Sequence, residues 1–187
     1  MRPSCWSADR AAPRVLLRGL ALLALAAPLL GQAPDRATLE SYYRAVGGHL
    51  GVPPSEVMIL SDWPLEPEEI PVALYVADRG GISPEAVVAL HRSGMAWTAV
   101  SRRYGLDAGS FYVRLEGDAG SLSRIYEAYR SRPPAQWSGI DIRDDEVVAL
   151  VNLRILSAVL GVAPLTVLQA RDRTGSWVVA FRTLALR

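Results

Sequence analysis

The chain has 187 residues, of which half are apolar and 21% are charged, a composition that suits one globular domain and excludes an intrinsically disordered protein. Its formal charge of +1 provides no broad electric field for nucleic acid or anionic lipid. Arginine supplies every basic side chain apart from the two histidines, which excludes chemistry that depends on lysine, such as Schiff-base catalysis or the phosphate-binding lysine of P-loop proteins.

The N-terminal segment has the layout of a secretory signal peptide. Four arginines precede the apolar run from Gly19 to Leu30, and small residues follow the run up to Ala33. The run is about half as long as the ~20 residues that a membrane span needs. We therefore predict a signal peptide over residues 1–33, cleavage near Ala33, and a periplasmic or secreted protein that meets the membrane only before cleavage. A retained segment is the alternative.

Cleavage would also change the charge and the cysteine content. It removes four arginines and one aspartate from totals of 20 and 19, which leaves 16 basic and 18 acidic residues and a charge near −2. The one cysteine, Cys5, precedes the apolar run. The mature protein is therefore expected to have neither a disulfide nor a cysteine-linked lipid anchor.

One pattern occurs three times after this segment: a glycine, an aliphatic residue, any residue, and a proline. The copies are Gly51 with Pro54, Gly81 with Pro84, and Gly161 with Pro164. Glycine suits the left-handed residue that ends a helix, and proline suits the first residue of the next helix. Each copy thus predicts a helix corner whose aliphatic residue (Val52, Ile82 or Val162) turns into the core.

The predicted fold is all-α, a small multi-helix domain forming an irregular orthogonal bundle over 34–187. Two subunits, 34–115 and 121–187, joined by a Gly- and Pro-rich connection, are an alternative.

Apolar residues at three- and four-residue spacing delimit the individual helices. In chain order the predicted helices are 37–50, 54–60, 70–79, 84–92, 96–104, 107–115, 122–129, 147–160, 164–171 and 177–184. Asp107 is expected to cap the 107–115 helix, and Asp144 to cap the helix that follows it. Residues 132–143 are predicted to form a loop. Residues 177–184 contain two adjacent valines, so a strand remains an alternative to helix there.

The second and third copies of the corner pattern share more than the corner. Pro84 is followed by Gly94 and Trp97, and Pro164 by Gly175 and Trp177, so the two tryptophans lie 80 residues apart. We interpret this as an internal repeat. Because both tryptophans occupy corresponding places, they are predicted to be core anchors rather than ligand contacts.

No residues have the spacing of a catalytic or metal site. His49 and His91 each lack a Cys, His or acidic neighbour at metal-ligand spacing. The acids from Asp141 to Glu146 lack the glycine and ligand spacing of a calcium loop. The sequence therefore predicts a protein that is not an enzyme and binds no metal or cofactor. Asn152, inside an apolar helix, is either a buried polar group or a residue of the wet face.

Five side chains are candidates for a ligand or partner surface: Trp63, Trp137, Arg102, Arg103 and Tyr104. Aromatic and arginine side chains are enriched at binding surfaces. Trp137 follows two prolines in the predicted loop, so we expect it to be exposed. The partner is predicted to be a protein.

Residues 92–115 bear two short resemblances. The order Trp97, Val100-Ser101, Gly105-Leu106 is similar to the helix-turn-helix of transposases and resolvases, which would make 107–115 a recognition helix with Ser110 and Arg114 available to read bases. The same segment resembles the middle of LysM modules, which bind N-acetylglucosamine glycans such as peptidoglycan and place the segment between two strands.

The sequence thus favours an exported helical binding or structural protein of the bacterial cell envelope, with helix-turn-helix DNA binding and LysM-like peptidoglycan binding as alternatives. The bacterial source is inferred from the signal layout and the arginine-only composition. Export and the slightly acidic mature chain disfavour nucleic acid as a partner.

Overall fold

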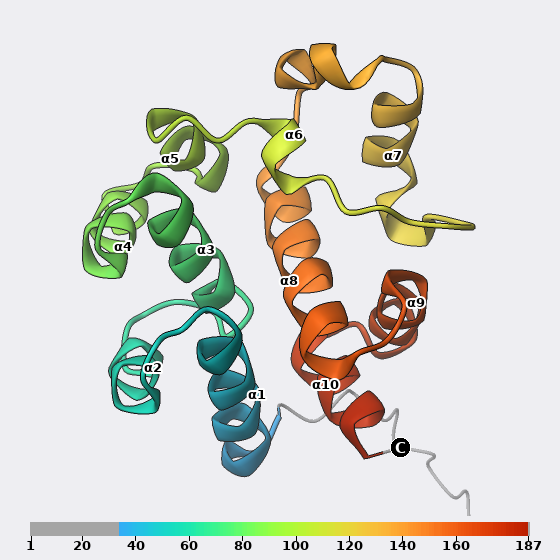
Figure 1. Ribbon diagram of the computed structural model, residues 1–187. Helices are drawn as coiled ribbons and strands as arrows, with labels where there is room; N and C mark the ends of the chain where they lie inside the picture. The colour runs from blue at the N-terminus through green and yellow to red at the C-terminus, as the bar shows by residue number, and fades with distance from the viewer. Residues whose placement is uncertain (1–33, 187) are drawn as a thin grey trace, which may run out of the picture. The chain divides into compact units, whose positions relative to one another are not determined.

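The computed structural model describes residues 34–186, and these contain helices and no strand. In chain order the elements are α1 (Arg36–His49), α2 (Pro54–Ser61), α3 (Ile70–Gly80), α4 (Pro84–Arg92), α5 (Trp97–Arg103), α6 (Ala108–Phe111), the 3-10 helix η1 (Gly120–Leu122), α7 (Ser123–Arg130), the 3-10 helix η2 (Pro134–Gly139), α8 (Asp144–Leu160), α9 (Pro164–Thr174) and α10 (Trp177–Ala185) (Figure 1). The all-α prediction is confirmed. The predicted signal peptide lies outside the described residues.

The three repeated glycines end helices in the left-handed conformation. Their φ angles are 70°, 63° and 64° at Gly51, Gly81 and Gly161. In each case the proline three residues later is the first residue of the next helix. The aliphatic residues between them, Val52, Ile82 and Val162, are only partly buried and pack against the edge of the core. The expectation that they turn fully into the core was therefore too strong.

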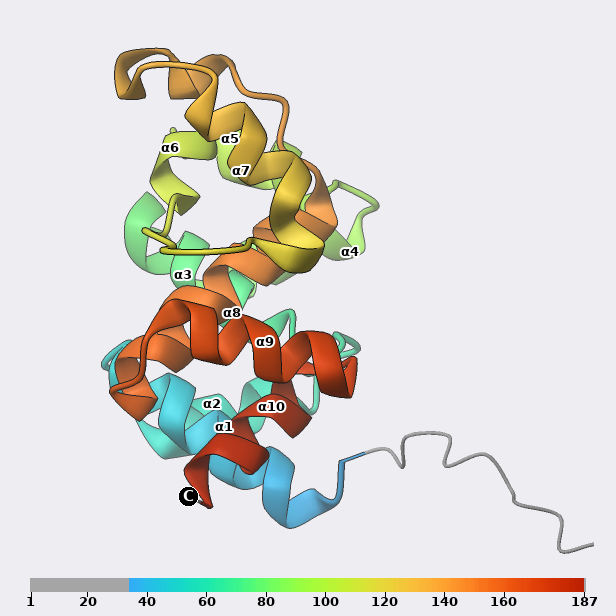
Figure 2. The same ribbon diagram turned by 90° about the vertical axis from the view of Figure 1, so that its right-hand side faces the viewer.

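Six of the other helices pack against helix α8. It has 17 residues and contacts α1, α3, α5, α6, α9 and α10. Figures 1 and 2 show α5 and α6 near its N-terminal end and α1, α9 and α10 near its C-terminal end. Leu150, Leu153 and Leu156 are fully buried along it. Among residues 34–186 no single helix meets the length and apolarity of a membrane span; α8 and α9 meet them only together, and they are bent by 118°.

Two helices that begin with tryptophan receive their caps from distant carboxylates. The backbone N–H groups of Trp97 and Thr98 donate to Asp144 at 2.9 and 3.0 Å, so the first residue of α8 caps α5. The N–H of Trp177 donates to Glu68, just before α3, at 2.6 Å. The prediction that Asp144 caps its own helix is therefore wrong. Its carboxylate accepts hydrogen bonds from the N-terminus of α5 instead. Each cap ties α3–α5 to α8–α10.

The prediction that Trp97 and Trp177 are core anchors is confirmed, because each side chain is 1% exposed. Asn152 is also fully buried, so it is a buried polar group and not a residue of the solvent-facing side of the helix. The hydroxyl of Tyr42 donates to its Oδ1, and its Nδ2 donates to the carbonyls of Glu68 and Val148, both at 2.8 Å. This amide joins α1, α8 and the turn before α3, and its bond with Tyr42 is buried.

Two predicted elements differ from the structure, and a third, for which a strand was the alternative, is the predicted helix. The predicted 107–115 helix ends at Phe111, because Phe111 is buried and the next residues run extended with the Tyr112 carbonyl bound by Arg154 at 2.7 Å. Residues 132–143, predicted as a loop, contain the 3-10 helix η2. Residues 177–184 are helical and not a strand, since Ser176 caps the Val179 N–H and the apolar residues occupy one helical face.

Candidate functional site

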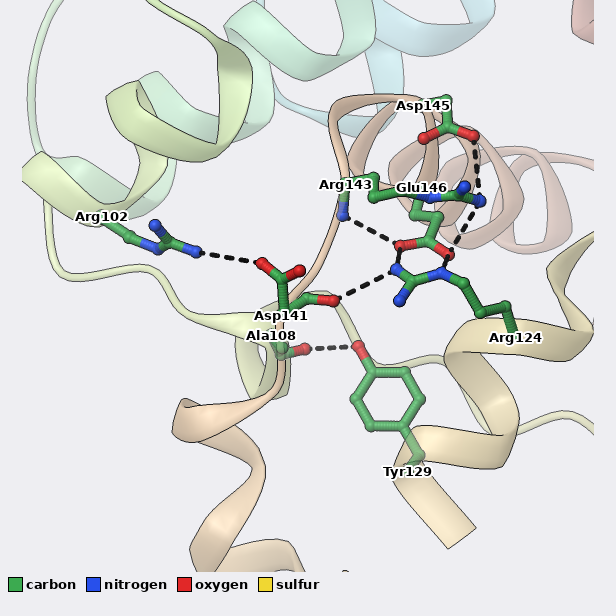
Figure 3. A network of polar contacts seen from close by, with 8 residues as sticks. All are labelled: Arg102, Ala108, Arg124, Tyr129, Asp141, Arg143, Asp145 and Glu146. Atoms are coloured by element: carbon green, nitrogen blue, oxygen red, sulfur yellow. Dashed lines mark hydrogen bonds and ion pairs between the residues drawn. The ribbon is translucent and has the colours of Figure 1, made fainter. Parts of the chain in front are cut away.

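A cluster of charged side chains surrounds Glu146, whose carboxylate oxygens both have hydrogen-bond partners within the protein (Figure 3). Arg124 pairs with both carboxylate oxygens, and its Nε lies 2.8 Å from Oε1. The backbone N–H of Arg143 donates to Oε2 at 2.9 Å. Arg124 also donates to the carbonyl of Asp141 at 3.1 Å. The carboxylate is buried and fully occupied, so the group ties α7 to the start of α8 and leaves no acceptor for a substrate.

The predicted surface residues on α5 and after it have different surroundings. Arg102 is exposed and lies 4.0 Å from the exposed carboxylate of Asp141, a pair that contributes little in water (Figure 3). Arg103 is exposed, and Tyr104 is partly buried. Tyr104 lines a hollow beside α3, described below.

The two predicted surface tryptophans are both partly buried. Trp63, between α2 and α3, packs against the core. Trp137 in η2 was expected to be exposed, but it is partly buried. Its ring centroid lies 4.4 Å from that of Tyr112, and its Nε1 donates to the carbonyls of Tyr129 and Arg132 at 3.1 Å. The 3-10 turn folds Trp137 back onto α7. The five predicted residues therefore lie in three separate segments of the structure.

The histidines have no metal partners among the residues that the structure describes, where no three His, Cys, Asp or Glu side chains converge. His91 stacks on Trp97, with ring centroids 4.0 Å apart. Its Nδ1 lies 2.9 Å from the Met95 carbonyl, and its Nε2 lies 3.5 Å from Glu69. His49 is exposed at the end of α1 and lines a hollow.

Four of the tyrosines are poor candidates for a base at neutral pH. Burial raises the pKa of Tyr42 well above its ordinary value and that of Tyr43 to about 12. Burial likewise raises the pKa of Tyr126 and Tyr129. Their hydroxyls therefore remain protonated at neutral pH. Those of Tyr126 and Tyr129 donate to the carbonyls of Val113 and Ala108 at 2.6 Å.

Two adjoining hollows share Tyr75, Arg79 and Arg154, and we call the pair the Arg154 hollow. One arm, of about 240 Å³, is also lined by His49, Leu50, Asp78 and Ile155. The other arm, of about 310 Å³, is also lined by Tyr104, Gly105, Leu106 and Ser110. The Arg154 guanidinium lies 5.7 Å from the Tyr75 ring centroid and that of Arg79 lies 5.5 Å from it. The hollow therefore concentrates positive charge around one aromatic ring.

Sequence reasoning missed Arg154, although a signal was present. It is the single charged residue between Val147 and Leu160, in a helix that is otherwise apolar except for Asn152 and Ser157. A charge at such a position is either paired inside the protein or used by a ligand. Whether such a charge is paired inside the protein or available to a ligand depends on the positions of the neighbouring helices, which the sequence does not give.

A second candidate surface lies on α2. Among residues 34–59 and 62–186, whose burial is described, the exposed large apolar side chains are Met58 and Ile59 on α2, 37% and 58% exposed, and Leu186, 82% exposed. Glu56 and Asp62 are exposed beside them. The sequence has no arginine or lysine between Leu50 and Asp78. We call this apolar surface with an acidic border the α2 face.

Comparison with known proteins finds no matching family model, no similar curated protein and no similar solved structure, so the α2 face and the Arg154 hollow are interpreted from their own chemistry.

Proposed function

We propose that this is an exported helical protein of the bacterial cell envelope that acts by binding another protein through the α2 face, and that it is not an enzyme. The observation that carries the proposal is the exposure of Ile59, a large aliphatic side chain 58% open to solvent beside Met58 on α2, where Val57 is fully buried. Adjacent exposed apolar side chains with a polar border are typical of protein–protein contacts.

The charge around the α2 face indicates the chemistry of the partner. Glu56, Asp62 and Glu66 are exposed near the apolar side chains, and no arginine or lysine occurs in this part of the sequence to offset them. A partner with an apolar centre and a basic border would match both features. The association should weaken as salt rises, since exposed charges are screened.

The effect of Ile59→Asp on partner capture tests this function. We expect the tagged wild-type protein, cross-linked in the exported protein fraction of its host, to recover one protein with an apolar and basic surface. A carboxylate at the centre of the contact should reduce its recovery about tenfold or more. Leu186→Asp is the matched control, because it places the same charge at another exposed apolar position. Circular dichroism should be unchanged in both variants.

Equal recovery by wild type and Ile59→Asp would overturn the role of the α2 face. Loss of recovery by both aspartate variants would also contradict it, because the effect would then follow from charge alone. If recovery of the partner protein did not fall as the salt concentration rises, the proposal that the partner has a basic border would be wrong.

Export predicts a defined N-terminus. Mass spectrometry of the native protein should find the chain outside the cytoplasm and beginning near residue 34, because the arginine-bearing start, the apolar run and the small residues after it form a cleavage signal. A chain with intact Met1 in the cytosolic fraction would contradict export and would favour the helix-turn-helix alternative.

Neither alternative gains support from the described residues. The recognition helix expected over 107–115 has four helical residues, and Ala108 and Phe111 in it are buried. LysM modules place their helices between strands, whereas residues 34–186 contain no strand. The proposal therefore stays with a protein partner.

A further inference from the structure

We propose that the Arg154 hollow binds the oxyanion group, carboxylate or phosphate, of a small ligand. This inference is independent of the α2 face and goes beyond the proposed function. It rests on a partly buried guanidinium that forms no ion pair with an acidic side chain among residues 34–186, at the common wall of two open hollows. Asp78, the acid that lines one arm, is paired with Arg79.

The charge of Arg154 is unusual within this protein. Among residues 34–186, seven arginines lack an ion pair with a carboxylate, and six of these are exposed; the seven are Arg44, Arg92, Arg103, Arg130, Arg132, Arg154 and Arg173. Water solvates the charge of the exposed six. Arg154 is partly withdrawn from water, and withdrawal of a charge is costly unless a partner replaces the lost hydration.

The partners that Arg154 does have are neutral. Its Nη2 donates to the carbonyls of Ser110 and Tyr112 at 3.3 and 2.7 Å, and its guanidinium lies near the face of Tyr75. These contacts fix the orientation of the side chain and offset part of the cost, but they bring no negative charge. An oxyanion would supply that charge.

The nitrogens of Arg154 divide into occupied, enclosed and available ones. Nη2 is occupied by the two carbonyls. Nε is enclosed and has no hydrogen-bond partner among the described residues. Nη1 has no bond to residues 34–186 and is not among the enclosed atoms, so it is the nitrogen that can donate to a ligand in the hollow.

Arg79 supplies the second charge. Its guanidinium lies beside the same Tyr75 ring, and its side chain is 58% exposed. Its pair with Asp78 is 3.8 Å long with both side chains largely in water, so it contributes little and can be exchanged for a ligand. Two guanidinium groups at one ring thus provide donors from α3 and from α8.

The flanking residues define where the rest of the ligand would lie. His49 lines one arm, and Tyr104 with the Ser110 segment lines the other. With the oxyanion at the shared wall, the body of a small ligand would occupy one arm of about 240 or 310 Å³. The larger arm reaches the lower end of the volume range of small-molecule sites, about 300–1,000 Å³, so the ligand would be small.

Calorimetric titration of the protein as its host exports it, with inorganic phosphate and with succinate at constant ionic strength, tests the inference. We expect saturable binding of at least one of these anions, and the tighter one assigns the ligand group as phosphate or carboxylate. N-acetylglucosamine, which is neutral, should not bind in the hollow. Arg154→Gln and Arg79→Gln should each weaken binding at least tenfold. Arg103→Gln, an exposed arginine at the end of α5, is the matched control and should leave binding unchanged.

Absence of saturable binding of both anions to the wild-type protein would overturn the inference. It would also be overturned if Arg79→Gln bound as tightly as wild type, or if Arg103→Gln weakened binding as much as Arg79→Gln. Arg79 is exposed, so its variant should fold even if Arg154→Gln does not, and the test then rests on the Arg79 and Arg103 pair.

Discussion

Trp97→Ala is expected to lower the free energy of unfolding by about 3–5 kcal/mol, the cost typical of truncating a buried large aromatic side chain. The side chain is 1% exposed. Its Nε1 donates to Glu69 at 2.9 Å, and its ring stacks on that of His91 at 4.0 Å. The change would leave a cavity at the start of α5 and would remove a hydrogen bond from Glu69, at the start of α3. Urea denaturation followed by circular dichroism measures the loss.

Two other tryptophans provide controls for this prediction. Trp177→Ala should cost a similar amount, since Trp177 is buried to the same extent at the start of α10. Trp63→Ala should cost less, because that side chain is only partly buried. If Trp97→Ala kept wild-type stability and instead lost binding to purified peptidoglycan sacculi, the core role would be wrong and the LysM-like alternative would be supported.

Asn152→Leu is expected to cost about 3 kcal/mol, because each buried polar group left without a partner costs about 1–3 kcal/mol. The amide is fully buried, and two groups depend on it: the Tyr42 hydroxyl and the Glu68 carbonyl. Leucine fills a similar volume but accepts and donates nothing. Urea denaturation again gives the difference in free energy of unfolding.

A double-mutant cycle with Tyr42→Phe separates the hydrogen bonds from the packing. Removing both Tyr42 hydroxyl and Asn152 amide leaves one unsatisfied group fewer than Asn152→Leu alone, so the double variant should be less destabilised than the two single effects together predict. Strict additivity, or an Asn152→Leu variant as stable as wild type, would show that the buried amide does not hold α1 to α8.

Local signals in the sequence were sufficient for most of the helices. A left-handed residue costs a non-glycine side chain about 1–2 kcal/mol, so a glycine followed by a helix-starting proline marks a corner without any tertiary information. Helix α4 begins at Pro84 and ends at Arg92 as predicted. The 107–115 helix was predicted too long. Asp107 does cap a helix, but the sequence around Tyr112 does not indicate that Arg154 will bind its carbonyl and that the helix will end at Phe111.

The sequence by itself determined the all-α class, the three corners and the burial of Trp97 and Trp177, because each depends on backbone preference or on the size of one apolar side chain. Only the tertiary structure decided which helix Asp144 caps, that Trp137 folds back onto α7, and that the charge of Arg154 faces Tyr75 and Arg79. The physical reason is that the energy of a polar or charged side chain depends on the partners and the water around it. Those partners come from distant segments of the chain: Glu68 lies 109 residues from Trp177, and Tyr42 lies 110 residues from Asn152.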